Sequence, residues 1–133
     1  MYKIESKTKL PDTDAAGILF FANYFKLAHE AYESFMDSID FGLNYIINQS
    51  DILILIARAE SDYKSSLRLS DEYELSISVE KLGKTSFVLA YEFTNGKGDL
   101  TAALKTVHVA ISKESQKPVA LPQSLRDRLA EHA

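Results

Sequence analysis

Length, composition and charge set the first limits on this sequence. The chain has 133 residues, of which 46% are apolar, and a net charge of −4. This length suits one domain with one core, so we expect residues 1–133 to form a single domain. The acidic balance disfavours a nucleic-acid partner, because such binding depends on many Lys and Arg contacts to phosphate. The absence of cysteine excludes thiolate nucleophiles, disulfides and cysteine metal sites.

The sequence shows no candidate membrane span or secretory signal. No apolar run approaches the ~20 residues that cross a bilayer. Residues 1–10 mix apolar and charged side chains and lack the apolar core of a secretory signal. We therefore expect no membrane span and a cytoplasmic location.

The first predicted element is a strand followed by an acidic loop. β-forming and polar residues are mixed over residues 2–10, which predicts an opening strand that stops at Pro11. Residues 11–17 then have turn chemistry and contain two acids, Asp12 and Asp14, and Gly17.

A helical pattern runs over residues 23–39. Apolar residues recur there at i, i+3 and i+4 spacing, at Tyr24, Leu27, Ala28, Ala31, Phe35 and Ile39. A second stripe widens this apolar face with Phe25, Tyr32 and Met36. A helix that is apolar over so much of its circumference has to be wrapped, and a curved sheet is the natural wrapping for so short a chain.

The remaining sequence supplies that sheet. The apolar run over residues 52–57 predicts a buried strand with a more polar end at Arg58, Glu60 and Asp62. Apolar and polar residues alternate over residues 73–80 and 87–93, which predicts an antiparallel hairpin. A Gly-rich turn then precedes a β-rich stretch at residues 100–112. Short pieces at residues 41–49 and 124–132 fit helices.

The junction between the acidic loop and the long helix is the best candidate for chemistry. A helix N-terminus presents unpaired backbone N–H groups and the positive end of the helix dipole. Such amides polarise a carbonyl oxygen, at roughly 3 kcal/mol per donor in oxyanion holes, and a nearby carboxylate can attack the carbonyl or activate water. Asp12 and Asp14 also fit plain turn and cap roles, and spacing alone does not choose between these interpretations.

Residues 12–24 resemble the N-terminal signature of the 4-hydroxybenzoyl-CoA thioesterase family of hotdog proteins. The likeness rests on an Asp, a Gly, an apolar run and an Asn-Tyr pair in fixed order. It continues over nearly the whole chain, at residues 62–63, 67–73, 82–87, 106–109 and 117–119. The resemblance implies an α+β hotdog fold, an antiparallel sheet wrapped around one long central helix, and an acyl-CoA thioesterase with active sites at dimer interfaces.

The resemblance also implies roles for particular residues. Asp14 matches the catalytic carboxylate, the backbone N–H of Phe21 matches the amide that polarises the thioester carbonyl, and Gly17 matches the loop glycine before the helix. The chain departs from many relatives at Ser65-Ser66, where they resemble Tyr-Leu-Arg-Pro, so we expect the edge of the acyl pocket to differ.

Residues 29–35 resemble the helix of the 1,4-dihydroxy-2-naphthoyl-CoA thioesterases of quinone biosynthesis. This likeness implies an aromatic acyl group, with 1,4-dihydroxy-2-naphthoyl-CoA the leading candidate. The alternatives are a general short- or medium-chain acyl-CoA thioesterase and a non-catalytic acyl-CoA or acyl-carrier binding protein on the same fold. A hotdog dehydratase or hydratase is a further alternative, although the acidic loop fits a thioesterase better.

Seven residues are candidates for binding the substrate, and Gly17 of the acidic loop is one of them. Tyr24, His29 and Tyr32 lie on the long helix and are candidates for the acyl pocket, although such residues on an apolar face are more often core residues. Lys84, Thr85 and Ser86 follow a glycine turn and are candidates for pantetheine or phosphate contacts. Arg126 and Arg128 are further candidates for the nucleotide phosphates, and ordinary surface charge explains each cation equally well.

We expect no metal and no separate cofactor, since CoA is part of the substrate. Three separated histidines make no convincing metal site. Glu60 and Asp62 share a strand face and offer a second carboxylate, although a solvated strand end explains them equally well. The long strands at residues 52–62 and 100–112 would leave an exposed apolar edge or face, which predicts a homodimer or homotetramer.

Overall fold

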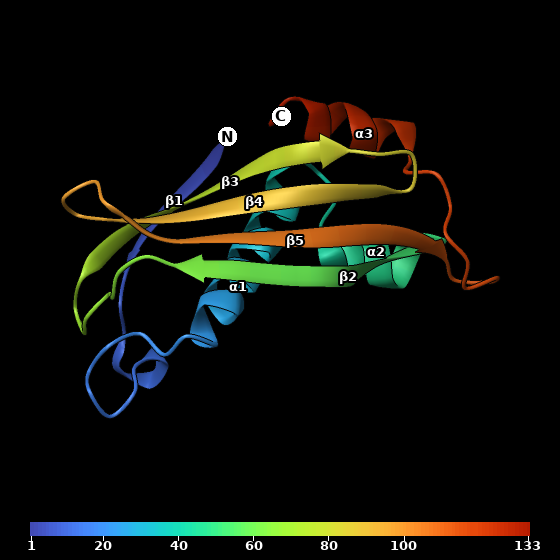
Figure 1. Cartoon of the computed structure of the whole chain (residues 1–133). Helices are drawn as coiled ribbons and strands as arrows, with labels where there is room; N and C mark the ends of the chain where they lie inside the picture. Colours follow the sequence, from blue (N-terminus) through green and yellow to red (C-terminus); the bar gives the residue numbers. More distant parts are fainter.

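The computed structural model describes residues 1–133 as one five-stranded antiparallel sheet with three α-helices (Figure 1). The strands are β1 (Tyr2–Lys7), β2 (Ile52–Tyr63), β3 (Glu72–Leu82), β4 (Ser86–Asn95) and β5 (Leu100–Ser112). The helices are α1 (Asn23–Ser38), α2 (Leu43–Gln49) and α3 (Gln123–Ala130), together with a 3-10 turn, η1 (Leu10–Asp12).

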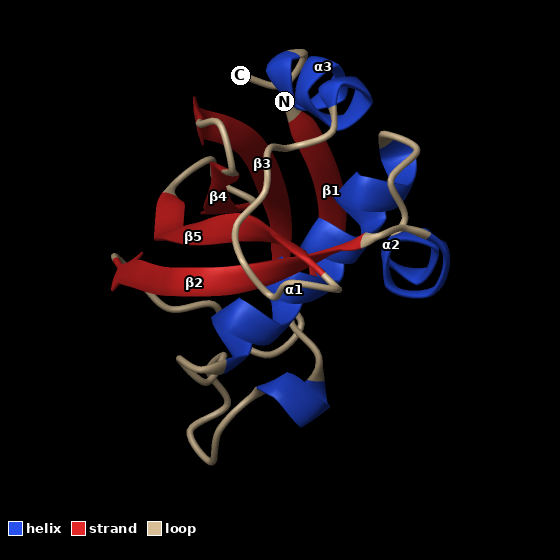
Figure 2. Cartoon of the chain, turned by 90° about the vertical axis from the view of Figure 1, so that its right-hand side faces the viewer, coloured by secondary structure: helices blue, strands red, loops and turns tan.

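The sheet has the strand order β1-β3-β4-β5-β2, and every neighbouring pair is antiparallel. Figure 2 shows this sheet curving around α1, with α3 beside the β1 and β3 side. Both chain termini lie next to α3, and the N–H of Val79 on β3 donates to the carbonyl of His132 at 2.9 Å. The predicted β-hairpin is formed by β3 and β4, which pair from Tyr73 with Asn95 to Leu82 with Phe87.

The core lies between α1 and the concave face of the sheet. The buried residues of α1 are Tyr24, Ala28, Ala31, Tyr32, Phe35 and Met36. Phe35 is fully buried, and its ring meets Tyr2 of β1 edge to face at 5.6 Å. Every second residue of β3 from Tyr73 to Val79 is buried, as the alternation predicts. The predicted wrapping of the sheet around the long helix is confirmed.

The element boundaries differ slightly from the predictions. Strand β1 ends at Lys7, before residue 10, because the following residues turn into η1 with Pro11 in its first turn. Helix α1 ends at Ser38, and Asp40 has the left-handed φ of 66° that commonly terminates helices. Both short helices are formed.

Strand β2 differs from the prediction of a buried strand. It is an edge strand that pairs only with β5, and Leu55 and Ile56 are 48% and 42% exposed. An apolar run does not distinguish a strand buried within one chain from an edge strand that needs a partner. Strand β5 lies between β4 and β2. Of these two long strands, only β2 therefore has the expected exposed edge.

A β-bulge alters which residues of β2 face the helix. The pairing register with β5 shifts between Ile56 and Arg58. As a result Ile56 and Ala59, three residues apart, both line the groove beside α1.

The helices of the structure are all too short or too polar to cross a membrane.

Candidate active site

The acidic loop before α1 folds into a small hairpin organised by Asp14. Thr13 pairs with Leu19 in an isolated β-bridge, and the N–H of Asp14 donates to the carbonyl of Ile18 at 2.9 Å. Asp14 Oδ1 accepts the N–H groups of Ala16 and Ile18 at 2.8 and 3.3 Å. Gly17 turns the chain with a φ of 76°, a conformation that favours glycine.

This hairpin is attached to the segment before β3. Leu19 N–H donates to Leu67 O at 2.7 Å, and Leu69 N–H donates to Gly17 O at 2.8 Å. Ile18 also forms a β-bridge with Arg68. The backbone around Asp14 is therefore held from both sides, which restricts the position of its carboxylate.

The two acids of the loop have different environments. Asp12 is buried, and its Oδ1 pairs with Lys26 Nζ of α1 at 2.7 Å. This hydrogen bond raises the pKa of Lys26. The carbonyl of Asp12 accepts the N–H of Phe20 at 3.0 Å and the side-chain amide of Asn23 at 2.9 Å. Asp12 thus fastens the loop to the helix, whereas Asp14 is half-buried and its Oδ2 accepts no hydrogen bond.

The start of α1 presents free backbone donors. Ala22 is the N-cap residue and provides no side-chain cap, and no acid lies in the first turn. The N–H groups of Phe21 and Ala22 have no acceptor within the chain. Tyr63, at the end of β2, donates its hydroxyl to the carbonyl of Phe21 at 2.9 Å and orients this peptide segment. An acceptor oxygen brought to Phe21 would meet an unpaired N–H at the positive end of the helix.

A groove of about 360 Å³ lies beside α1 and includes Phe25, four residues after Phe21, but no residue of the acidic loop lines it. Its residues come from the helix, from β2 and from the floor of the sheet: Phe25, Lys26, Ala28, His29, Ile56, Ala59, Tyr91 and Thr106. His29 is exposed, so it is not a hydrogen-bonded core residue. Its ring stacks on Tyr32 with centroids 5.6 Å apart.

The structure places the other two aromatic candidates deeper. Tyr24 is 3% exposed and packs on Phe93 and Tyr63, with ring centroids at 5.0 and 5.2 Å. Tyr32 is equally buried and lies 4.5 Å from the ring of His108. Burial raises the pKa of both tyrosines. They support the groove from below, and their contact with a substrate stays a prediction.

Lys84, Thr85 and Ser86 lie at the β3–β4 turn, at the far end of the sheet from the loop. Strand β4 runs from Ser86 toward Phe93, the contact of Tyr24, which corresponds to roughly 20–25 Å at ~3.3 Å per residue. One chain therefore does not bring the three residues together with Asp14.

The two arginine candidates are engaged within the chain. Arg126 donates to the carbonyl of Lys84, and Arg128 pairs with Asp40 at 2.6 Å. Glu60 forms a weak pair with Arg58 at 3.5 Å on the exposed part of β2.

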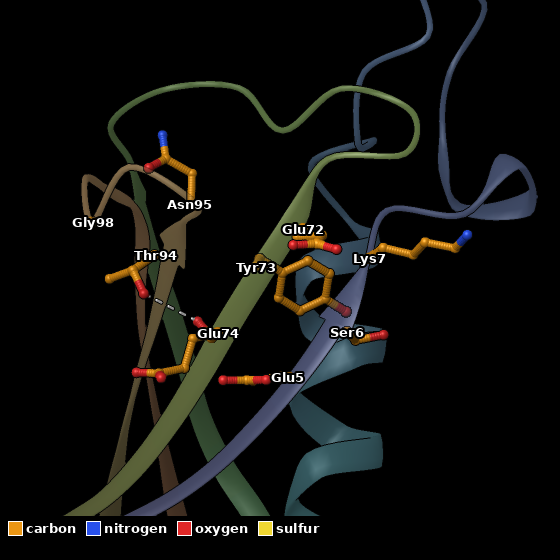
Figure 3. A pocket seen from close by; sticks show the side chains of 10 residues that line it. Glu5, Ser6, Lys7, Glu72, Tyr73, Glu74, Thr94, Asn95 and Gly98 are labelled. Carbon is orange, nitrogen blue, oxygen red and sulfur yellow. Dashed lines mark hydrogen bonds between the residues drawn. The ribbon is translucent and has the colours of Figure 1, made fainter.

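Another cavity, of about 670 Å³, lies elsewhere in the molecule. Figure 3 shows its lining at β1, β3 and the turn after β4, with Glu72 beside Tyr73 and the side chain of Lys7 directed away from the glutamates. None of the predicted site residues lines it. No set of three or more His, Cys, Asp or Glu side chains in the chain is placed to hold a metal ion.

The sequence did not single out three residues at or near the candidate site. Tyr63 supports the start of α1, while Tyr91 and Thr106 line the floor of the groove. Strand alternation places Tyr91 on the same face as Phe87 and Leu89. No sequence pattern gives the contact between the hydroxyls of Tyr91 and Thr106, because it depends on the register between β4 and β5.

An antiparallel sheet wrapped around one long helix, with an acid held in a turn before that helix, defines the hotdog class of thioesterase-like proteins. The family model described as "Thioesterase-like superfamily" matches residues 9–129. The chain belongs to this superfamily.

Relatives and solved structures agree with this assignment. A 1,4-dihydroxy-2-naphthoyl-CoA hydrolase of Rippkaea orientalis is 32% identical over 119 residues, which cover 88% of this chain and 86% of the relative. The crystal structure of a 1,4-dihydroxy-2-naphthoyl-CoA thioesterase from Synechocystis matches with a TM-score of 0.91 and 27% identity, over 98% of this chain and 96% of that one. A gentisyl-coenzyme A thioesterase structure matches with a TM-score of 0.85 and 27% identity, over 96% and 99% of the two chains.

Proposed function

We propose that this chain hydrolyses an acyl-CoA thioester to the free acid and CoA. The observation that carries the proposal is the junction of loop and helix. Phe21, whose N–H is unpaired, comes directly after the hairpin that contains Asp14. One carboxylate oxygen of Asp14 accepts two backbone hydrogen bonds, and the other accepts none. A donor for the carbonyl and an oxygen base are the two groups that thioester hydrolysis requires.

In the proposed mechanism, the thioester carbonyl oxygen accepts a hydrogen bond from the N–H of Phe21. The helix dipole and this amide stabilise the negative charge that develops on the oxygen. Asp14 Oδ2 then takes a proton from a water that attacks the carbonyl carbon, or it attacks that carbon itself and forms an anhydride that water cleaves. In both routes the C–S bond breaks, and CoA leaves as the thiol or thiolate. The amides of Ala16 and Ile18 hold Oδ1, so that Oδ2 keeps a fixed direction.

We propose an aromatic acyl group, with 1,4-dihydroxy-2-naphthoyl-CoA the leading candidate. Phe25 and His29 are four residues apart and share one side of α1, and Phe21 lies four residues before Phe25, just outside the helix. An acyl group whose carbonyl sits at Phe21 would therefore extend along the groove toward His29. Apolar walls from Phe25, Ile56 and Ala59 suit a flat ring. Relatives of matching length are named for hydroxylated aromatic substrates.

We also propose a homodimer or homotetramer that works in the cytoplasm, where its CoA substrate would be found. In this assembly Lys84, Thr85 and Ser86 would contact CoA bound at the site of a partner subunit. Their distance from Asp14 within one chain supports this arrangement.

The test is the release of free thiol from a panel of esters by the purified chain. The panel contains 1,4-dihydroxy-2-naphthoyl-CoA, benzoyl-CoA, and straight-chain acyl-CoAs of short, medium and long length. We expect the highest kcat/KM with the dihydroxynaphthoyl ester. Faster hydrolysis of a straight-chain ester would favour the general thioesterase, and tight binding without thiol release would favour the binding protein.

A second arm of the same assay examines His29. Because this side chain lies at the mouth of the groove, His29→Ala should reduce kcat/KM for the hydroxylated ester more than for benzoyl-CoA. Equal losses on both esters would assign His29 a structural role.

A further inference from the structure

Three buried side chains form a hydrogen-bonded chain under the groove. Tyr91, Thr106 and His108 are 1%, 5% and 0% exposed. The hydroxyls of Tyr91 and Thr106 are 2.9 Å apart, and Thr106 Oγ1 lies 2.7 Å from His108 Nε2. Tyr91 and Thr106 line the groove, whereas His108 lies behind them and stacks on Phe87 at 4.9 Å. These hydrogen-bonded side chains therefore connect the core to the groove.

The direction of these hydrogen bonds follows from the state of His108. Burial lowers the pKa of His108 to about 3, so at neutral pH its ring carries one proton. His108 Nδ1 is buried and has no partner. An unpaired buried N–H is rarer and costlier than an unpaired acceptor, so the proton belongs on Nε2.

With this tautomer, each of the three side chains donates its hydrogen bond in the direction of the groove. His108 Nε2–H donates to the Thr106 oxygen, and the Thr106 hydroxyl donates to the Tyr91 oxygen. The hydroxyl hydrogen of Tyr91 then has no acceptor within the chain. Burial raises the pKa of Tyr91 to about 12, so its phenol stays protonated and remains a donor.

We propose that the hydroxyl of Tyr91, held by Thr106 and His108, binds a ring oxygen of the aromatic acyl group and selects hydroxylated rings over plain ones. This inference rests on the proposed function. The groove is lined by the apolar side chains of Phe25, Ala28, Ile56 and Ala59, and Lys26 and His29 are its other polar residues besides Thr106. A plain ring would bury the donor of Tyr91 without an acceptor, whereas a ring oxygen satisfies it, and such sites discriminate strongly against the analogue that lacks the polar group.

The test compares 4-hydroxybenzoyl-CoA with benzoyl-CoA and reports the ratio of their kcat/KM values. Tyr91→Phe removes the donor, and Thr106→Val removes the group that orients it with little change of shape. Each should lower the ratio roughly three- to tenfold, the value of one hydrogen bond. Thr106→Ser keeps the hydroxyl and should retain the ratio of the wild type.

Matched controls are buried hydroxyl residues outside the groove. Tyr73 is 5% exposed at the far cavity, and Thr101 is 0% exposed and donates to Phe93 O at 3.0 Å. Tyr73→Phe and Thr101→Val should leave the ratio unchanged. A ratio that falls equally in the controls, or that stays constant in folded Tyr91→Phe and Thr106→Val, would overturn the proposal.

A binding arm separates this inference from the proposed hydrolysis. 4-Hydroxyphenacyl-CoA and phenacyl-CoA are thioethers that cannot be hydrolysed, and their Kd values are measured by calorimetry. The wild type should bind the hydroxylated compound more tightly, and Tyr91→Phe should lose that preference. Absence of thiol release with a retained Kd difference would reject the hydrolase and keep the ring-oxygen contact. Equal Kd values for the wild type would reject the contact. If Tyr91→Phe does not fold, the pair Thr106→Val and Thr106→Ser decides.

Discussion

Asp12 and Asp14 are separated by a single residue, yet the fold uses their carboxylates differently. Asp12 pairs with Lys26 and accepts two donors at its carbonyl, so it joins the loop to α1. Asp14 turns the hairpin with Oδ1 and leaves Oδ2 free. The sequence does not assign these roles, because they depend on Lys26 reaching back from the helix. The resemblance identifies the catalytic candidate, and the contacts explain why the other acid is structural.

We predict that Asp14→Asn lowers kcat roughly a hundredfold or more while the fold stays intact. Asn keeps a carbonyl oxygen that accepts the N–H groups of Ala16 and Ile18, but its amide neither attacks a thioester nor takes a proton from water. The measurements are thiol release and Tm. Asp12→Asn is the control: it removes the ion pair with Lys26 and should lower Tm. A folded Asp14→Asn variant with near-normal turnover would remove Asp14 from the mechanism.

The buried ring of His108 predicts that the protein loses stability in mild acid. Burial lowers its pKa to about 3, with a smaller contribution from His29, whereas an unfolded His titrates near 6.5. Between these pH values His108 binds a proton in the unfolded chain but not in the folded one. The free energy of unfolding is therefore highest above about pH 6.5 and falls as the pH is lowered below it. His108 alone should lower the unfolding free energy by about 2 kcal/mol when the pH falls from 6.5 to 5.

Urea unfolding at several pH values checks this prediction. His108→Gln does not titrate and should show a smaller fall in unfolding free energy between pH 6.5 and 5 than the wild type. A residual fall is expected from His132, whose pKa burial also lowers. Parallel pH profiles for the two proteins would contradict the prediction.

At the scale of elements, periodicity predicts what lies on one face of one segment. Helix α1 begins at the predicted residue 23 and ends at Ser38, one residue before the predicted end. The pattern locates this helix well because its apolar stripe continues over four turns. The strands β3 and β4 alternate in burial as predicted, and β5 has its predicted bounds. These elements pack within the chain, so their local patterns contain enough information.

Contacts between elements are what the sequence leaves open. His108 is buried, and its link through Thr106 to Tyr91 depends on pairing β4 with β5 in one register. Strand β2 was predicted to be buried because its first residues are all apolar, yet its neighbour on one side is absent from the chain. Periodicity gives the face of a residue and does not give its partner across the sheet.

At the scale of the whole molecule, the two edges of the sheet differ. Strand β1 has 6 residues, and Lys3, Glu5 and Lys7 alternate along it, which opposes pairing with another chain. Strand β2 has 12 residues and starts with a continuous apolar run that includes the exposed Leu55 and Ile56. The start of α1 and the groove lie beside β2, so a partner on this edge would also cover part of the proposed active site.

We therefore predict a dimer or higher oligomer at micromolar concentration, formed through β2. A free edge strand offers unpaired N–H and C=O groups, and pairing would also bury the exposed apolar side chains of Leu55 and Ile56. Light scattering coupled to size exclusion measures the mass of the assembly. Leu55→Glu places a charge on this edge without altering a residue of the groove, and it should shift the mass toward the monomer and lower turnover in parallel. Leu10→Glu is the matched control, since Leu10 is 69% exposed and lies outside β2, and its mass should equal that of the wild type. A wild-type monomer with full activity would contradict the prediction, as would a Leu55→Glu monomer that hydrolyses the ester at the normal rate.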